Sequence, residues 1–228
     1  MDVGFDPGSR PLSLSICLPL SCRYNEERRL SERRLRFNVE ELKKVAANAL
    51  NRPTSDIKSF RKLAEGGFNR IFEISMIDGS SILARLPYPS TLPLRLAVAS
   101  EVATLDFVRA QGVPTPRILG YSVDENAVGS EYMFMEKLPG KPIGDAWFKL
   151  SEKERLKVLL QIVEFEAKLF KAGLPASGSI YYSSDLPSSI PKVDIPNSAD
   201  GLCIGPYAAL RWWFGERGDL DVDRGPRK

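Results

Sequence analysis

Three acidic side chains alternate in the segment RGDLDVD, residues 217–223. Asp219, Asp221 and Asp223 have the spacing of the first three oxygen ligands of a calcium-binding loop. That loop needs a glycine at the next position, where this sequence has Arg224, and its twelfth position would lie beyond the last residue. The Arg-Gly-Asp tripeptide also occurs in integrin-type adhesion motifs, but these need an extracellular chain, which the composition does not support. The segment is therefore predicted to be a polar turn.

A pair of glycines offers a second kind of chemistry. Gly66 and Gly67 lie in LAEGGFNRIF, between two β-type runs. A turn without side chains lets backbone N–H groups approach a phosphate closely, and Asn69 can bond the local backbone and hold the turn. An ordinary hairpin turn is the alternative. The segment is not a Walker loop, because the pattern G-x-x-x-x-G-K-[ST] is absent.

A single charge interrupts the apolar run ILARLPYP at Arg85. A buried cation needs an anionic partner, and Glu101, sixteen residues later in the next predicted helix, could supply it. Kinase-like sites use such a pair to hold the α- and β-phosphates of a nucleotide. The alternative is that Arg85 lies on an exposed face of the sheet.

A strand followed by a polar stretch is predicted in YMFMEKLPG. The backbone at Glu136 and Leu138 could there hydrogen-bond the edge of an adenine. Taken alone, the pattern indicates only a strand and a loop.

The composition excludes several classes of mechanism. The chain has 228 residues and no histidine, which removes Ser-His-Asp and Cys-His catalysis and histidine-ligated zinc. Its cysteines, Cys17, Cys22 and Cys203, form no Cys-x-x-Cys pair and are odd in number, so a reduced compartment is expected. The net charge of +3 is spread along the chain and does not indicate a nucleic-acid partner. No run of eighteen apolar residues occurs, so no membrane span is predicted.

Periodicity and turn signals predict the elements that carry these residues. Gly66-Gly67 and Asp78-Gly79 separate three β-type runs between Ile57 and Pro87, which predicts antiparallel strands joined by two tight turns. Two further strands are expected at 117–122 and 131–135. Residues 174–206 are rich in Ser, Pro and Gly and are expected to be irregular. Helices are predicted over residues 38–50, 94–111 and 151–172, and at the start of PYAALRWWFGERG.

Two of these helices begin with a capping-box pattern, Asn38 with Glu41 and Ser151 with Glu154. The arginine-rich segment 23–36 is predicted to be a solvated helix with intrahelical ion pairs, and a basic targeting helix is the alternative. The later helix carries an apolar stripe, which its period predicts to be buried. That stripe consists of Leu156, Leu159, Leu160, Val163, Ala167 and Phe170.

Taken in order, these segments resemble the aminoglycoside phosphotransferase-like kinases, and most of all their fungal branch of altered-inheritance-of-mitochondria proteins. The resemblance runs from about Arg23 to the end of the sequence. The segments that carry it are LAEGGFNRIFEI, ILARLPYP, ASEVATLDFVRAQGVPTPRILGYS, SEYMFMEKLPGKPIGDAW and CIGPYAALRWWFGERGDLDVDRGP.

The resemblance implies an α+β fold with a kinase-like small lobe, an antiparallel sheet plus a helix, followed by an incomplete helical large lobe. It implies ATP with Mg²⁺ as the nucleotide and a hydroxyl acceptor, whose identity it leaves open. Arg85 stands where the family usually has a phosphate-binding lysine, and the two side chains are not equivalent donors. The implied nucleotide-binding residues are Gly66, Gly67, Phe68, Asn69, Arg85, Glu101, Met135, Glu136 and Leu138.

The family's catalytic loop reads His-Gly-Asp-Leu, with an Asn that helps bind magnesium five residues after the Asp. Aligned there, Asp219 would be the base and Arg224 would occupy the position of the magnesium ligand. No catalytic or metal-binding residue is therefore predicted, and the chain is expected to be catalytically incomplete. Two alternatives remain open, a non-catalytic module that binds nucleotide or a partner protein, and a nonfunctional fragment.

The resemblance and the predicted elements together divide the chain into four parts. We expect a flexible tail (1–22), an N-terminal helical extension (23–56), a nucleotide-binding small lobe (57–140) and the start of a large lobe (141–228). If the large lobe is incomplete, the stripe on the helix over 151–172 and the aromatic cluster at 212–214 are expected to be exposed, with poor solubility and marginal stability. The fungal relatives imply a mitochondrial location, and the cytoplasm is the alternative.

Overall fold

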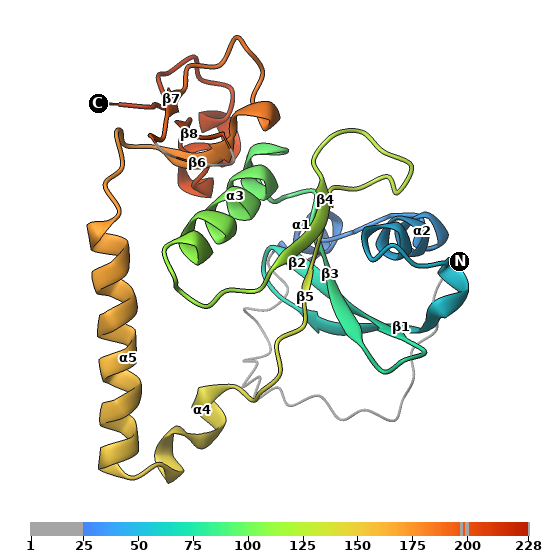
Figure 1. Cartoon of the computed structure of the whole chain (residues 1–228). Helices are drawn as coiled ribbons and strands as arrows, with labels where there is room; N and C mark the ends of the chain where they lie inside the picture. The colour runs from blue at the N-terminus through green and yellow to red at the C-terminus, as the bar shows by residue number, and fades with distance from the viewer. Residues whose placement is uncertain (1–24, 197, 199–200, 228) are drawn as a thin grey trace.

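The computed structural model describes residues 25–196, 198 and 201–227. Within them, five strands form an antiparallel sheet in the order β1-β2-β3-β5-β4, with one helix packed on each face (Figure 1). This is the α+β class that the sequence predicts. The flexible tail expected at residues 1–22 lies outside the described part. The strands are β1 (Ile57–Glu65), β2 (Asn69–Met76), β3 (Ser81–Pro87), β4 (Ile118–Ser122) and β5 (Tyr132–Glu136).

The first three strands form two consecutive hairpins, as their turn residues predict. The second turn needs its glycine, because Gly79 has a φ of +86°, which side-chain-bearing residues rarely adopt. The Asp78 carboxylate supports this turn by accepting from the Ser80 N–H at 2.9 Å. The Asp-Gly pair is thus explained by local backbone geometry.

One face of the sheet packs against α2 (Val39–Ala49) and forms the main core. Alternation along β2 places Phe72, Ile74 and Met76 on this face, where they are 7%, 0% and 0% exposed, and burial of each side chain contributes roughly 1.5–3 kcal/mol. Asn38 caps α2, as predicted, by accepting from the N–H groups of Glu40 and Glu41. The Glu41 carboxylate binds Lys44, so the cap is one-sided.

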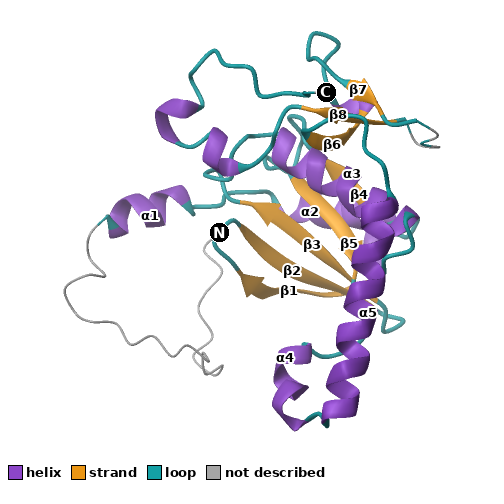
Figure 2. Ribbon diagram, turned by 90° about the vertical axis from the view of Figure 1, so that its left-hand side faces the viewer, coloured by secondary structure: helices purple, strands orange, loops and turns teal. Residues whose placement is uncertain are grey.

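The other face of the sheet carries α3 (Leu96–Ala110), and a second, smaller sheet packs on the far side of that helix (Figure 2). The smaller sheet has the order β6-β8-β7, with β6 (Ser179–Tyr182), β7 (Val193–Asp194) and β8 (Leu202–Gly205). Buried Val98 and Val102 of α3 share a hydrophobic cluster with Met133 of the large sheet and Tyr181 of the small one. The helix α3 is thus held between two sheets.

Two predictions for the second half of the chain were wrong. Residues 174–206, expected to be irregular, contain the small sheet, because its strands of two to four residues stand among Ser, Pro and Gly and yet β6 and β8 bury most of their side chains. The helix expected in PYAALRWWFGERG is reduced to two short 3₁₀ turns, η4 (Leu210–Trp212) and η5 (Gly215–Arg217). Gly215, with a φ of +59°, breaks the helical path between them.

The remaining helices lie outside the two cores. In α1 (Glu26–Glu32), the Nε of Arg28 binds the carboxylate of Glu32 at 2.8 Å. The solvated ion-paired helix predicted over 23–36 is thus confirmed for this part only, and residues 34–38 are not helical. The short α4 (Ile143–Ala146) and the 3₁₀ turn η2 (Trp147–Lys149) lead into α5 (Glu152–Lys171), and another 3₁₀ turn, η1 (Thr54–Asp56), precedes β1. The predicted capping box between Ser151 and Glu154 is present at the start of α5.

The helix α5 stands apart from the sheet, as Figure 1 shows. None of its side chains is buried, so the stripe that its period predicts to be buried is exposed, Phe170 by 90%. The exposure expected for an incomplete large lobe is therefore found, and Trp212 and Phe214 are also exposed. Among the described helices, none is long and apolar enough to cross a membrane.

Candidate functional site

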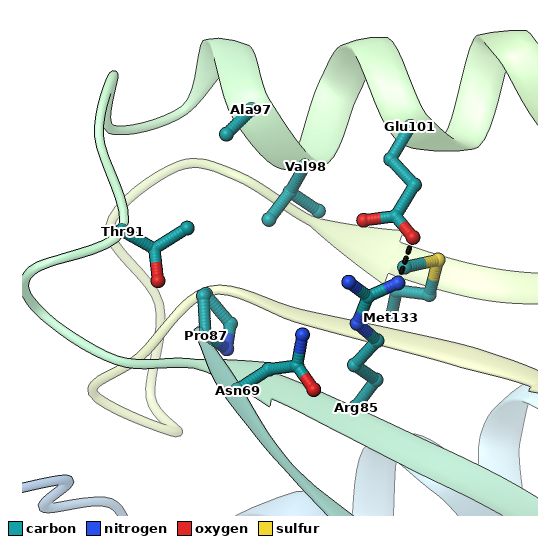
Figure 3. A pocket seen from close by; sticks show the side chains of 8 residues that line it. All are labelled: Asn69, Arg85, Pro87, Thr91, Ala97, Val98, Glu101 and Met133. Atoms are coloured by element: carbon teal, nitrogen blue, oxygen red, sulfur yellow. Dashed lines mark ion pairs between the residues drawn. The ribbon is translucent and has the colours of Figure 1, made fainter. Parts of the chain in front are cut away.

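The centre of the site is an ion pair between the large sheet and α3 (Figure 3). Arg85 projects from β3 toward α3, and its Nη1 binds the carboxylate of Glu101. The predicted pair is therefore formed, and the alternative of an exposed sheet position for Arg85 was wrong. Burial lowers the pKa of Arg85 from its ordinary value, although arginine remains charged at physiological pH.

Asn69 completes this cluster from the first residue of β2. With its amide oxygen turned toward Arg85, it accepts from Nη2 at 2.7 Å and from Nε at 2.9 Å. Asn69 was expected to hold its own turn through the local backbone, and it positions the guanidinium instead. The turn is closed by the backbone, where the Gly66 N–H donates to the Asn69 carbonyl at 2.9 Å.

A small cavity adjoins the cluster. It encloses about 30 Å³ and is bordered by Thr91, Ala97, Val98 and Met133 in addition to the polar residues. This volume holds about one or two water molecules. A ligand as large as a nucleotide would therefore lie outside the cavity and reach only the outer edge of the guanidinium.

The glycine turn is open on its outer side. Neither Gly66 nor Gly67 has a positive φ, and a Cβ added at Gly67 would meet no atom within 4 Å. The chain therefore does not need glycine at position 67 for its own conformation or packing. The remaining reason for a glycine here is that the absence of a side chain allows an external group to approach the backbone closely.

The predicted hinge lies where β5 ends. The Glu136 N–H donates to the Arg117 carbonyl at 2.9 Å, and the Glu136 carboxylate accepts from the Arg117 N–H at 3.2 Å. The Glu136 N–H is thus already engaged and cannot serve an adenine, contrary to the expectation for that group. Met135 is paired with strands on both sides, whereas Leu138, two residues after the end of β5, is exposed.

A buried carboxylate near this hinge escaped the sequence analysis. Glu73 in β2 is 3% exposed and binds Lys137, just after β5, and Arg61 of β1. The hydrogen bond from Lys137 is the main reason that its pKa is lowered. Because Glu73 pairs with Leu83 in the register and Arg85 lies two residues further on, Glu73 and Arg85 share a face of the sheet. The signal was available, since Glu73 interrupts the apolar run RIFEISM as Arg85 interrupts its own.

The helix α3, which carries Glu101, is also held by the small sheet on the side away from the large sheet. Tyr182 of the small sheet donates its hydroxyl to the Asp106 carboxylate of α3 at 2.7 Å. Tyr181, next to it, is fully buried, and its hydroxyl donates to the Pro206 carbonyl at 2.8 Å. The position of Glu101 therefore depends on a part of the chain that follows it by about eighty residues.

The acidic segment 217–223 is a turn built around a cation. The guanidinium of Arg224 donates to the carbonyls of Arg217 and Leu220 and lies 4.1 Å from the centroid of the Trp213 ring. Arg224 thus has a structural role in this turn, and if the segment were aligned with the kinase catalytic loop it would stand where that loop has a magnesium ligand. In the described part of the chain, no three His, Cys, Asp or Glu side chains gather as a metal site would require.

Comparison with known proteins places this arrangement in a family. The sequence model of the phosphotransferase enzyme family (APH) matches residues 59–187, more than half of the chain, so the protein belongs to the phosphotransferase enzyme family. This confirms the family that the sequence resembles.

Two relatives show where the similarity lies. A subtelomeric hrmA-associated cluster protein of Aspergillus fumigatus is 41% identical over 167 residues, which cover 72% of this chain and 32% of that protein. Altered inheritance of mitochondria protein 9, mitochondrial, of Candida tropicalis is 33% identical over 150 residues, which cover 61% of this chain and 24% of the relative. The chain thus spans a third or less of the length of these relatives.

A solved structure was also found, that of a putative aminoglycoside phosphotransferase from Ralstonia eutropha. It is 18% identical, covers 46% of this chain and 29% of its own, and superposes with a TM-score of 0.34.

Proposed function

We propose that this chain binds the phosphate groups of ATP between the glycine turn and Arg85, as the nucleotide-binding part of a phosphotransferase. The observation that carries the proposal is the position of Arg85, held by Glu101 and Asn69 on the sheet face beside an open glycine turn. Membership of the phosphotransferase family supports the same assignment.

The hydrogen bonds of Arg85 leave it suited to phosphate. A guanidinium has five N–H donors. Glu101 engages Nη1, and Asn69 engages Nε and Nη2, so a second proton on each of Nη1 and Nη2 remains. Each of these two protons can bind a phosphate oxygen, because a guanidinium donates to several acceptors in its plane. In this proposal the Gly67 N–H supplies a further donor, and the segment from Met135 to Leu138 borders the adenine.

Magnesium would have to enter with the nucleotide. The described residues do not fit a magnesium site of their own, because no cluster of carboxylates forms and Arg224 fills the turn at 217–223. Phosphate binding in this proposal therefore rests on Arg85 and on backbone donors.

We propose further that the 228 residues bind nucleotide without transferring its phosphoryl group. The sequence contains no His-x-Asp-x(4)-Asn pattern, and the residue five positions after Asp219 is a cation. The acceptor hydroxyl stays open. A partner-binding, non-catalytic module is the second candidate, and the exposed stripe of α5 favours it. For the location we propose the mitochondrion, supported by the names of relatives and by the basic segment 23–36.

Calorimetric titration of the purified chain tests the binding proposal. ATP and ADP, each with and without MgCl₂, are expected to give saturable heat, and no heat with any of the four would contradict it. Incubation with γ-labelled ATP tests the second proposal, and no release or transfer of label is expected. Phosphoryl transfer that is lost in Glu101→Ala would show that the chain is an active enzyme.

A further inference from the structure

An arginine from the N-terminal extension reaches the glycine turn. Arg33 follows α1, and its Nη2 donates to the Gly66 carbonyl at 2.9 Å, across 33 positions of sequence. The same nitrogen lies 3.9 Å from the carboxylate of Glu65, the last residue of β1. The extension and the turn are therefore linked by a charge-assisted hydrogen bond to a backbone carbonyl.

The buried ring of Tyr88 and the partly exposed carboxylate of Glu65 hold this arginine in place. The guanidinium carbon of Arg33 lies 5.3 Å from the centroid of the Tyr88 ring, and Tyr88 is 1% exposed. The Tyr88 hydroxyl donates to Glu65 at 2.7 Å, and Arg70 donates to the same carboxylate oxygen at 2.9 Å. Burial alone would raise the pKa of Glu65, but hydrogen bonds from Arg70, Tyr88 and Lys62 lower it to about 2. The base of the turn thus stays ionised at neutral pH.

The bond from Arg33 sets the direction of one N–H group. The Gly66–Gly67 peptide bond is trans and planar, so the Gly66 carbonyl and the Gly67 N–H point in opposite directions. By holding the carbonyl on one side, Arg33 directs the Gly67 N–H to the other. That N–H has no acceptor among the described residues, and the space beside Gly67 is open.

The carbonyl of Phe68, two residues further along the turn, is held as well. Phe68 accepts from the Tyr88 N–H at 2.9 Å and from the Thr91 hydroxyl. The two carbonyls on either side of Gly67 are therefore both engaged by the chain. An anion that approaches the turn at Gly67 meets an N–H donor, while the carbonyl oxygens of Gly66 and Phe68 are already tied to donors of the protein.

We propose that Arg33 is a positioning residue of the nucleotide site, which holds the Gly66–Gly67 peptide so that the Gly67 N–H meets a phosphate. This inference rests on the proposed ATP binding and extends the site into the N-terminal extension. Arg33 acts through the peptide, because it binds the carbonyl side. Removal of the Arg33 side chain weakens the binding of ligands that carry phosphate and leaves the binding of adenosine unchanged.

The test compares Arg33→Ala with Arg34→Ala in the full chain. Arg34 is the next residue, is exposed, and its side chain makes no hydrogen bond or ion pair in the described structure, so its removal changes the net charge equally. ATP, ADP and adenosine are titrated into the wild type and both variants, and thermal melting shows that each variant is folded. For Arg33→Ala we expect roughly three- to tenfold weaker binding of ATP and ADP and unchanged binding of adenosine.

The outcomes separate this inference from the proposed function. If the wild type binds ATP and the two variants bind it equally well, the role of Arg33 is refuted and the proposed function stands. If both variants bind ATP and ADP equally more weakly than the wild type, the effect of Arg33 is only that of its positive charge, and the positioning role is refuted. If Arg33→Ala also loses adenosine binding, the role of Arg33 is only structural, and the positioning role is again refuted. If the wild type binds neither ATP nor ADP, both proposals fail.

Discussion

Replacing Glu73 by glutamine should measure how firmly the hinge is tied to β2. The carboxylate is 4% exposed, whereas the side chains of its partners are 39% exposed for Lys137 and 60% for Arg61. Removing one partner of a fully buried pair costs about 3–5 kcal/mol. Both cations here can be rehydrated after Glu73→Gln, so we expect a loss of about 1–2 kcal/mol, between the buried and the surface case.

Urea unfolding at pH 7 measures this loss of stability, and the melting temperature should fall by about 3–6 °C in a chain of this size. The stabilisation by Glu73 should also depend on pH, in a direction set by the shift of its pKa. Because the folded-state pKa of Glu73 lies below its ordinary value of 4.5, its stabilisation is complete above that value and is lost as the pH falls. The difference between wild type and variant should therefore shrink from pH 7 toward pH 3.

Glu40→Gln serves as the control, because Glu40 is 70% exposed and pairs with Lys43 within the same helix. It should change the stability by less than about 0.5 kcal/mol. An equally small effect for Glu73→Gln, or a difference from wild type that is the same at pH 7 and pH 3, would refute the reasoning.

Four further substitutions probe other parts of the structure. Gly67→Ala should leave thermal stability unchanged and weaken ATP binding, whereas Gly79→Ala should cost about 1 kcal/mol and leave ATP binding unchanged; the reverse pattern would contradict the external role of Gly67. Asn38→Ala should cost about 1 kcal/mol in urea unfolding by removing the cap of α2, and no cost would argue against the cap. Tyr182→Phe should cost about 1 kcal/mol and loosen α3, because the hydrogen bond to Asp106 is lost. Amide hydrogen exchange in α3 should become faster, and unchanged exchange would show that this bond does not hold the helix.

The sequence was informative where a local rule determines the structure. Asp78-Gly79 predicts a hairpin because few residues adopt the backbone that the turn needs, and Gly79 does have a positive φ. Arg85 and Glu101 could be paired because a charge in an apolar strand requires a counter-ion and the next helix offers one. The capping box at Ser151 and Glu154 is likewise a short-range pattern.

The sequence was silent where contacts join distant segments. Glu73 meets Lys137 across 64 positions, and Arg33 meets Gly66 across 33, and no local pattern states such a pairing. The small sheet was missed because its short strands are buried by pairing with each other and by packing on α3, which is a tertiary effect. The period of α5 predicts an apolar stripe, but a period does not show what covers it.

The central claim is that Arg85 binds phosphate, and the ratio of ATP to adenosine affinity tests it most directly. This ratio should be measured for the wild type and for Arg85→Met, which keeps much of the side-chain volume and removes the charge and the donors. Arg85→Met is expected to weaken ATP binding by about tenfold or more, while the adenosine affinity stays the same. An unchanged ratio in Arg85→Met would contradict it.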